Sequence, residues 1–269
     1  MTATAQPERT AGLLVALDAG VLRVTIARLE RMNAIDLDTM RALGDLLEGR
    51  ARETDVRVVV LAGEGGSFCT GADLMAASTG PQTDPRVVMD TANRVIRQIL
   101  TLPVPVVAQV DGAAAGVGAS IAFAADLIYA APTAYFLLAF VNIGLMPDGG
   151  ASLLVPAAAG RARASELALL GERLSAEGAH AAGLITRVLP AEELAAHVSG
   201  VAARLAAGPR RALELTKRSL TAATLDRVEQ AFDRETEGQI ELLASADFRE
   251  GVLAMLSKRT PKFGARGSD

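Results

Sequence analysis

The chain of 269 residues contains no tryptophan, one cysteine and two histidines, and only 3% of its residues are aromatic. The single cysteine, Cys69, cannot form an internal disulfide, which is typical of proteins in a reducing compartment. One cysteine and two histidines that lie far apart in the sequence form no metal-binding motif. We therefore expect no disulfide framework and no bound metal, and we predict a cytoplasmic location.

Excess positive charge and long apolar runs are also missing. The formal net charge is −4, which argues against a broad nucleic-acid surface. The longest apolar run, residues 113–125, falls short of the roughly 20 residues that a membrane-spanning helix needs. Half of the residues are hydrophobic, so a chain of this length can bury a full aliphatic core. The composition predicts a soluble protein with neither a nucleic-acid nor a membrane partner.

Strand-like and helix-like segments alternate up to about residue 190, and only helix-like segments follow. Such alternation is typical of the α/β class. We expect a disordered lead-in at residues 1–12, an α/β core at 13–190 and a helical region at 191–269. The expected strands are residues 13–17, 21–27, 57–61, 104–110, 127–130 and 184–189. The expected helices are residues 39–52 (capped by Asp36 or Asp38), 87–100, 161–170, 175–182 (capped by Ser175), 191–207, 209–222, 225–244 and 246–257, with a mobile loop at 75–85.

A stretch of small residues follows the β-branched run at 104–110. It begins with the turn Asp111-Gly112 and continues into a helix-like segment that starts near Val117. Small residues let the backbone approach another backbone or a ligand closely. The first turn of a helix presents unpaired N–H groups and the positive end of the helix dipole. This geometry suits an oxygen atom on which negative charge develops.

Two common glycine- and serine-based motifs are absent. Residues 116–118 lack the last glycine of a dinucleotide-binding loop, because Ile121 occupies its position, and no Gly-Lys-Ser/Thr occurs. Ser120 does not lie in a Gly-x-Ser-x-Gly turn, and His180 and His197 are expected on polar helix faces. The sequence therefore predicts neither a nucleotide-binding loop nor a Ser-His-Asp triad.

A series of short motifs occurs in a fixed order along nearly the whole chain. They are FCTGADL at 68–74, VDG at 110–112 with GVG at 116–118, GLMPDGG at 144–150, LSAE at 174–177, GLI at 183–185, and EGV followed by KRTPKF at 250–263. With this set the chain resembles the crotonase (enoyl-CoA hydratase/isomerase) superfamily from about Leu13 to Phe263. The resemblance implies a spiral of ββα units and a helical C-terminal region that forms homotrimers, often stacked as hexamers. It also implies acyl-CoA thioester substrates, with coenzyme A as part of the substrate and no separate cofactor.

The resemblance assigns binding positions as well. The family holds the thioester oxygen with two backbone N–H groups, and the matching residues are Ala72 and Val117, where valine replaces the usual glycine. Residues expected to line the coenzyme A channel, largely through their backbone, are Arg31, Met32, Ala34, Ala72, Asp73 and Leu74. Lys258, Lys262 and Phe263 match a tail that meets the nucleotide end of coenzyme A, often from a neighbouring subunit. The two lysines also fit a solvated basic terminus that complements a helix C-terminus.

The catalytic positions depart from those of the family's hydratases. Two glutamates hold the reacting water in those enzymes, and the matching positions carry Ser120 and Phe140, with Ala139 in place of a nearby proline. Neither side chain can take a proton from water near neutral pH, and packing explains both. Asp148 matches the acid/base of isomerases in the family, and apolar neighbours would raise its pKa toward neutrality. The alternative for Asp148 is a helix cap ahead of Gly149-Gly150.

We therefore predict an enoyl-CoA isomerase in which Asp148 moves a proton from C2 to C4. One group that serves twice is sufficient for a double-bond shift, whereas hydration needs an activated water. Two alternatives stay open at this point. One is an acyl-CoA-binding protein without catalysis, and the other is a hydratase with a base in the loop at residues 75–90, for instance Asp84 or Asp90.

Overall fold

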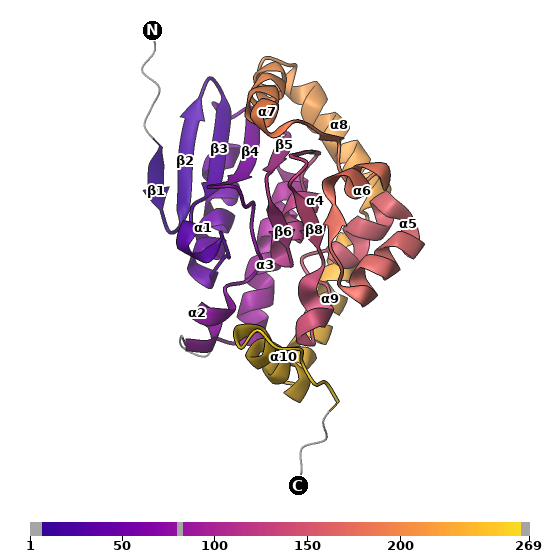
Figure 1. Ribbon diagram of the computed structural model, residues 1–269. Coiled ribbons are helices and arrows are strands. Elements are labelled where there is room, and N and C mark those ends of the chain that lie inside the picture. The colour runs from indigo at the N-terminus through magenta and orange to yellow at the C-terminus, as the bar shows by residue number, and fades with distance from the viewer. Residues whose placement is uncertain (1–6, 80–82, 265–269) are drawn as a thin grey trace.

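Two β-sheets of different size form the centre of the fold (Figure 1). The computed structural model describes residues 7–79 and 83–264. The larger sheet has the strand order β1 (Glu8–Thr10), β2 (Leu13–Asp18), β3 (Val21–Ile26), β4 (Val58–Gly63), β5 (Val106–Val110), β7 (Leu127–Ala130) and β10 (Arg187–Val188). The smaller sheet has the order β6 (Ala113–Ala115), β8 (Tyr135–Leu137) and β9 (Leu174–Ser175). Helices before residue 190 are α1 (Leu37–Glu48), α2 (Leu74–Thr79), α3 (Pro85–Thr101), α4 (Val117–Phe123), α5 (Ala151–Leu170) and α6 (Ala176–Ala181).

Successive turns of the chain follow the same path from the larger sheet to the smaller sheet and then to a helix. β5 leads to β6 and α4, and β7 leads to β8, the 3-10 helix η3 (Ala139–Ile143) and α5. The preceding turn runs from β4 through Cys69, which bridges Ala114 in parallel, to α2 and α3. Because β4, β5 and β7 are parallel neighbours, the segments that follow them also lie side by side. This is the expected spiral of an α/β fold.

The central strand β4 is buried on both faces, as its β-branched sequence predicts. Alternate residues point to opposite faces of a strand. Val59 and Leu61 join the apolar cluster that includes residues of α1 and α3, whereas Val58 and Val60 join a second cluster with α7 (Ala191–Ala206). The sheet is therefore packed between helices from both ends of the chain.

The remaining C-terminal helices are α8 (Arg210–Thr224), α9 (Val228–Leu243) and α10 (Ala246–Leu256). In α8, the buried Lys217 donates to the carbonyl oxygens of Ile99 (2.7 Å) and Val104 (3.2 Å) and pairs with Asp126 (2.8 Å). α9 packs against α3 and α5, and α10 packs against η3 and lies at the same end of the molecule as α2 (Figure 1). The helical region thus reaches the loop that follows η3.

Several local expectations need correction. Residues 8–10 form β1, which pairs with β2, so the lead-in is not unstructured there; residues 1–6 lie outside the described residues. Residues 74–79 form α2 within the expected mobile loop, of which residues 80–82 lie outside the described part. The expected strand at 184–189 is shortened to β10. His197 is half-buried and packs edge-on against Tyr129 (4.9 Å between ring centroids) instead of facing solvent.

Other local expectations are confirmed. Asp36 caps α1 by accepting from the N–H of Thr39 (2.8 Å), and Ser175 caps α6 by accepting from the N–H of Gly178 (3.1 Å). The helix expected at 161–170 is the second half of α5, which breaks at Gly160 (φ 76°). No helix among the described residues is long and apolar enough to cross a membrane.

Candidate active site

The N–H of Ala72 points away from the parallel bridge in which Ala72 takes part. Its bridge partner Ile35 uses the neighbours of Ala72 instead: Ile35 N–H donates to Gly71 O (2.8 Å), and Asp73 N–H donates to Ile35 O (3.0 Å). Among the described residues, no acceptor lies within hydrogen-bonding distance of the Ala72 N–H. This amide is therefore available to a ligand.

Val117 occupies the corresponding place one turn later in the spiral. It is the first residue of α4 and follows Gly116, whose φ of 54° and ψ of −130° favour glycine. In the described part of the chain no group accepts from the Val117 N–H. A Cβ atom on Gly116 would lie 3.7 Å from the Cα of Gly71. The amides of Ala72 and Val117 thus follow two glycines that lie close together.

Asp148 lies between η3 and α5 and is 9% exposed. Its Oδ2 accepts a hydrogen bond from Nε2 of Gln239 (2.6 Å), and its Oδ1 is buried with no partner among the described residues. Burial raises the pKa of Asp148 to about 7, although the Gln239 hydrogen bond opposes this change, and the charge of Glu235 adds to it. The carboxyl group can therefore gain or lose a proton near neutral pH.

Ser120 connects Asp148 to α4. Its hydroxyl donates to the backbone oxygen of Asp148 (2.7 Å), and a Cβ atom on Gly149 would lie 3.0 Å from the Ser120 Cβ. Val117 and Ser120 are three residues apart in α4, or about 4.5 Å along the helix axis. The position that the resemblance matches to a hydratase glutamate therefore holds a residue that packs against, and bonds to, the Asp148 loop.

Asp148 is not the cap of α5, which was the alternative to a catalytic role. The N-cap residue is Gly150, and the helix N-terminus is satisfied by the carboxylate of Glu235 in α9. This carboxylate accepts from the N–H groups of Gly150 (2.7 Å) and Ser152 (2.9 Å). Asp148 contributes only its backbone oxygen, to Ala151 N–H at 3.3 Å. The cap hypothesis for the Asp148 side chain is wrong.

Residues 16–266 match the family described as enoyl-CoA hydratase/isomerase. The chain belongs to the enoyl-CoA hydratase/isomerase family. It is 39% identical to 1,2-epoxyphenylacetyl-CoA isomerase of Escherichia coli (strain K12), over 93% of this chain and 97% of the relative. It is also 39% identical to a probable enoyl-CoA hydratase of Rhodobacter capsulatus, over 93% and 96%. The crystal structure of an enoyl-CoA hydratase from Mycobacterium avium subsp. paratuberculosis K-10 superposes with a TM-score of 0.88 at 46% identity, over 95% of this chain and 99% of that one.

Two residues around Asp148 were missed by the sequence analysis, which gave the C-terminal helices of this family member only an oligomerisation role. Glu235 and Gln239 are four residues apart in α9 and so lie on the same helix face. Both are almost completely buried, at 0% and 1% exposed, beside Ala231 and Phe232. A glutamate and a glutamine on the apolar face of a helix are the signal that could have identified them.

The residues expected to line the coenzyme A channel of the family are brought together in two adjoining segments. The bridge between Ile35 and Ala72 and the hydrogen bond from Thr70 Oγ1 to Met32 O (3.1 Å) join residues 31–35 to residues 70–74. Met32 is 66% exposed, whereas Ala34 is half-buried and accepts a hydrogen bond from Arg28 at its backbone oxygen. Leu74 is half-buried at the first residue of α2.

An ion-pair cluster fixes these two segments. Both carboxylate oxygens of Asp73 accept from Arg31 (2.8 and 3.1 Å), and Oδ2 also lies 3.1 Å from Arg28. Burial by itself would raise the pKa of Asp73, but hydrogen bonds from Arg31, the N–H of Ala76 and Arg28 lower it to about 2. Asp73 is therefore ionised at neutral pH and serves to order the loop.

The C-terminal residues Lys258, Lys262 and Phe263 are exposed beyond α10. Glu250 holds this tail, because its carboxylate accepts from the Lys262 N–H (2.7 Å) and from the Arg259 side chain (2.8 Å). Within the described residues, no hydrogen bond or ion pair joins the tail to residues 31–34 or 72–74. The structure of one chain does not unite the two sets of expected coenzyme A residues.

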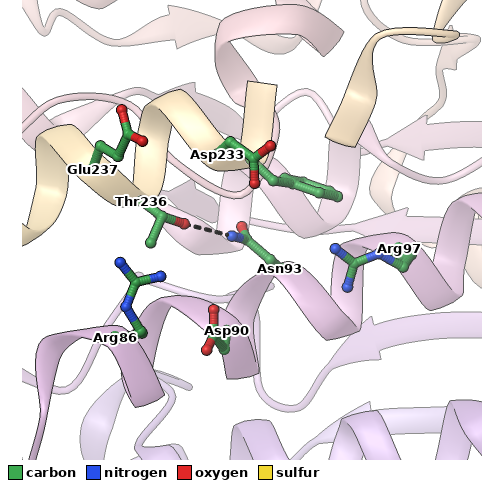
Figure 2. Close-up of a pocket in the computed structure, with 8 residues that line it drawn as sticks. Arg86, Asp90, Asn93, Arg97, Asp233, Thr236 and Glu237 are labelled. Atoms are coloured by element: carbon green, nitrogen blue, oxygen red, sulfur yellow. Dashed lines mark hydrogen bonds between the residues drawn. The ribbon is translucent and has the colours of Figure 1, made fainter. Parts of the chain in front are cut away.

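A polar cavity of about 280 Å³ lies between α3 and α9 (Figure 2). Asp90, which was considered as a hydratase base, is exposed at this cavity together with Arg86 and Asp233. Asp84, the other candidate, caps α3 by accepting from the N–H of Arg86 (2.9 Å). Ala72, Val117 and Asp148 do not line this cavity. Among the described residues, no cluster of histidine, cysteine and acidic side chains could hold a metal ion.

We expect Glu235→Ala to lower the free energy of unfolding by about 2 kcal/mol, because the buried N–H groups of Gly150 and Ser152 lose their acceptor. Urea denaturation measures this change. Glu229→Ala is the matched control in the same helix, since it removes an exposed ion pair with Arg97 and should cost less than about 1 kcal/mol. Equal losses in the two variants would contradict the capping role of Glu235.

Proposed function

We propose that this chain is an enoyl-CoA isomerase that moves the double bond of a 3-enoyl-CoA into conjugation with the thioester. The observation that carries the proposal is the buried carboxylate of Asp148, which has one unpartnered oxygen and a pKa raised to about 7. The unpaired amides of Ala72 and Val117 add the second requirement, a preformed oxyanion site. The two positions that match the glutamates of the hydratases carry other residues in this chain. One is Ser120, whose hydroxyl is hydrogen-bonded to the Asp148 backbone oxygen, and the other is the buried Phe140.

The reaction follows from these groups. The N–H groups of Ala72 and Val117 donate hydrogen bonds to the thioester oxygen and stabilise the negative charge that forms on it. Oδ1 of Asp148 takes the proton from C2, and the electron pair of that C–H bond moves into the C1–C2 bond to give a dienolate. Asp148 then returns the proton to C4, where the C3=C4 electron pair forms the new C–H bond. The C1=C2 electron pair shifts to C2=C3, and the negative charge on oxygen returns to restore the thioester carbonyl. A base with a pKa near the working pH suits both transfers.

The relatives support the reaction class and leave a second candidate. The name of the Escherichia coli relative states that it is an isomerase of an acyl-CoA. The Rhodobacter capsulatus relative carries the name of a probable enoyl-CoA hydratase, which favours hydration as the second candidate. Hydration in this chain would need a residue other than Ser120 or Phe140 to act as the base. The third candidate, acyl-CoA binding without turnover, predicts no product from any enoyl-CoA.

We propose further that coenzyme A binds along residues 31–34 and 72–74, with the Lys258–Phe263 tail of a neighbouring copy at its nucleotide end. Large apolar side chains stay exposed on the C-terminal helices, which supports association of copies into a homotrimer or hexamer. They are Leu215 and Leu220 of α8 and Leu253, Met255 and Leu256 of α10. No separate cofactor or metal takes part in the proposed reaction. A cytoplasmic location stays a prediction from the single cysteine.

We expect the purified protein to convert 3-enoyl-CoA into 2-enoyl-CoA, with a rate that falls as the pH drops below about 7 because Asp148 becomes protonated. Asp148→Asn should lower kcat by at least about 100-fold, because the amide cannot take the proton. The measurement offers 2-enoyl-, 3-enoyl- and saturated acyl-CoA in parallel and identifies products by absorbance and mass. Hydration of 2-enoyl-CoA without isomerisation, or full activity of Asp148→Asn, would refute the proposal.

We expect Val117→Pro to lower kcat on the order of 100-fold, because proline removes one oxyanion donor. Proline is accepted at the first position of a helix, so α4 should persist. Val117→Ala keeps the donor and should stay within a few-fold of the unchanged protein. Circular dichroism checks the helix content of both variants. Equal activities of the proline and alanine variants would show that this amide does not hold the thioester oxygen.

Light scattering in solution should give a mass of three or six chains. Leu253→Glu in α10 is expected to lower this mass, because it places a charge on an exposed apolar surface that we assign to the contact between copies. Leu169→Glu changes a similarly exposed residue in α5 and is the comparison that locates the contact. A monomer at all concentrations would contradict the proposed assembly.

A further inference from the structure

The side-chain amide of Gln239 is fixed at both ends. Its Nε2 donates to Oδ2 of Asp148 (2.6 Å), and its Oε1 accepts from the backbone N–H of Met146 (3.3 Å). A backbone N–H can only donate, so the amide oxygen must face Met146 and the amide N–H must face the carboxylate. The residue is 1% exposed, so water does not compete for either bond. The fold therefore directs the Nε2–H of Gln239 to Oδ2 of Asp148 and not to Oδ1.

We propose that Gln239 is a positioning residue that keeps Oδ2 of Asp148 as an acceptor, so that Oδ1 alone takes up and returns the proton. The inference rests on the isomerase reaction proposed above. It gives the helical C-terminal region a part in the chemistry of the site.

The two protonation states of Asp148 explain why this arrangement suits a double-bond shift. A proton on Oδ2 would face the Gln239 N–H, and two buried donors would then point at each other without an acceptor. A proton on Oδ1 leaves the Gln239 hydrogen bond intact, because Oδ2 is then a carbonyl oxygen that still accepts. The side chain therefore needs no rotation between taking the proton from C2 and returning it to C4, which keeps the reacting atoms aligned.

Close packing of α9 against the Asp148 loop supports the same role. Gly238, next to Gln239, lies directly under the Met146 side chain, and a Cβ atom there would collide with Sδ of Met146. Glu235, one helical turn earlier, fixes the other end of the loop through Gly150 and Ser152. The loop is thus held from the same helix face on both sides of Asp148.

Gln239→Met tests the proposal, since methionine has a similar length but no N–H donor. The lost hydrogen bond favours the carboxylate form of Asp148. Its removal should therefore shift the midpoint of the acidic limb in the pH profile of kcat/KM to a pH about one unit higher. Activity at pH 7 should then fall about fivefold and recover to within about twofold above pH 9, with KM within about twofold. An unchanged pH profile, or a loss of kcat that is equal at every pH, would overturn the proposal.

The matched control is Thr236→Val in the same helix. Thr236 is 5% exposed and accepts a hydrogen bond from Asn93 of α3 (3.0 Å) at the cavity between α3 and α9, which Asp148 does not line (Figure 2). This variant removes a buried hydrogen bond of α9 but leaves the Gln239 amide in place, so its pH profile should match that of the unchanged protein. An equal shift in both variants would assign the effect to the packing of α9 and would overturn the role of Gln239.

A titration without substrate separates this inference from the proposed function. Carbon-13 NMR of aspartate carboxyl groups follows Asp148 in the free protein, and the signal that disappears in Asp148→Asn identifies it. Glu235 is the charged group that acts on Asp148 among the described residues, and both Gln239→Met and Thr236→Val retain it. A higher pKa of Asp148 in Gln239→Met, in a protein without isomerase activity, refutes the function but keeps the positioning. Isomerase activity together with an unchanged pKa refutes the positioning alone.

Discussion

The side-by-side stacking of successive chain turns is the constraint on which the site depends. Parallel pairing of β4, β5 and β7 in one sheet sets the register of the short segments in the other, where Cys69 bridges Ala114 and Ala114 pairs with Phe136. The points at which successive turns of the chain leave the smaller sheet are therefore neighbours in space. At two of these points lie glycines that are close to each other, and the N–H that follows each glycine has no acceptor among the described residues. Unpaired donors cost stability. In the reaction that we propose, these two N–H groups donate to the oxyanion.

The second constraint is the burial of two acidic groups, Glu235 and Asp148, where α9 packs against the loop before α5. Glu235 is satisfied by two backbone N–H groups, whereas Asp148 has a partner for only one of its oxygens. An incompletely solvated carboxylate is unfavourable, and the raised pKa of Asp148 is the direct consequence of this. The same burial that weakens the charged form brings the group into the pH range where it can exchange a proton. In the reaction that we propose, the burial that costs stability at Asp148 is also what makes this residue a usable acid and base.

Local sequence patterns predicted the elements well where one segment determines its own structure. The caps at Asp36 and Ser175 and the buried strand β4 follow from residue type and spacing. Patterns failed where a partner far along the chain decides the outcome. β1 forms because β2 lies beside it, and His197 is half-buried because Tyr129 lies beneath it. The sequence left open that Asp148 caps α5, but the structure shows that the Glu235 carboxylate accepts from the N–H groups at the start of that helix.

The sequence by itself determined the family, the turning points at Gly71 and Gly116, and Asp148 as the acid left at the expected position. The tertiary structure alone decided which groups meet. Ser120 and Asp148 are 28 residues apart in the chain, Gly150 and Glu235 are 85 apart, and Asp148 and Gln239 are 91 apart. Spacing within a helix or strand reports which face a residue occupies, but it does not report which element will cover that face. The free oxygen of Asp148 and the fixed amide beside it are products of packing between distant segments.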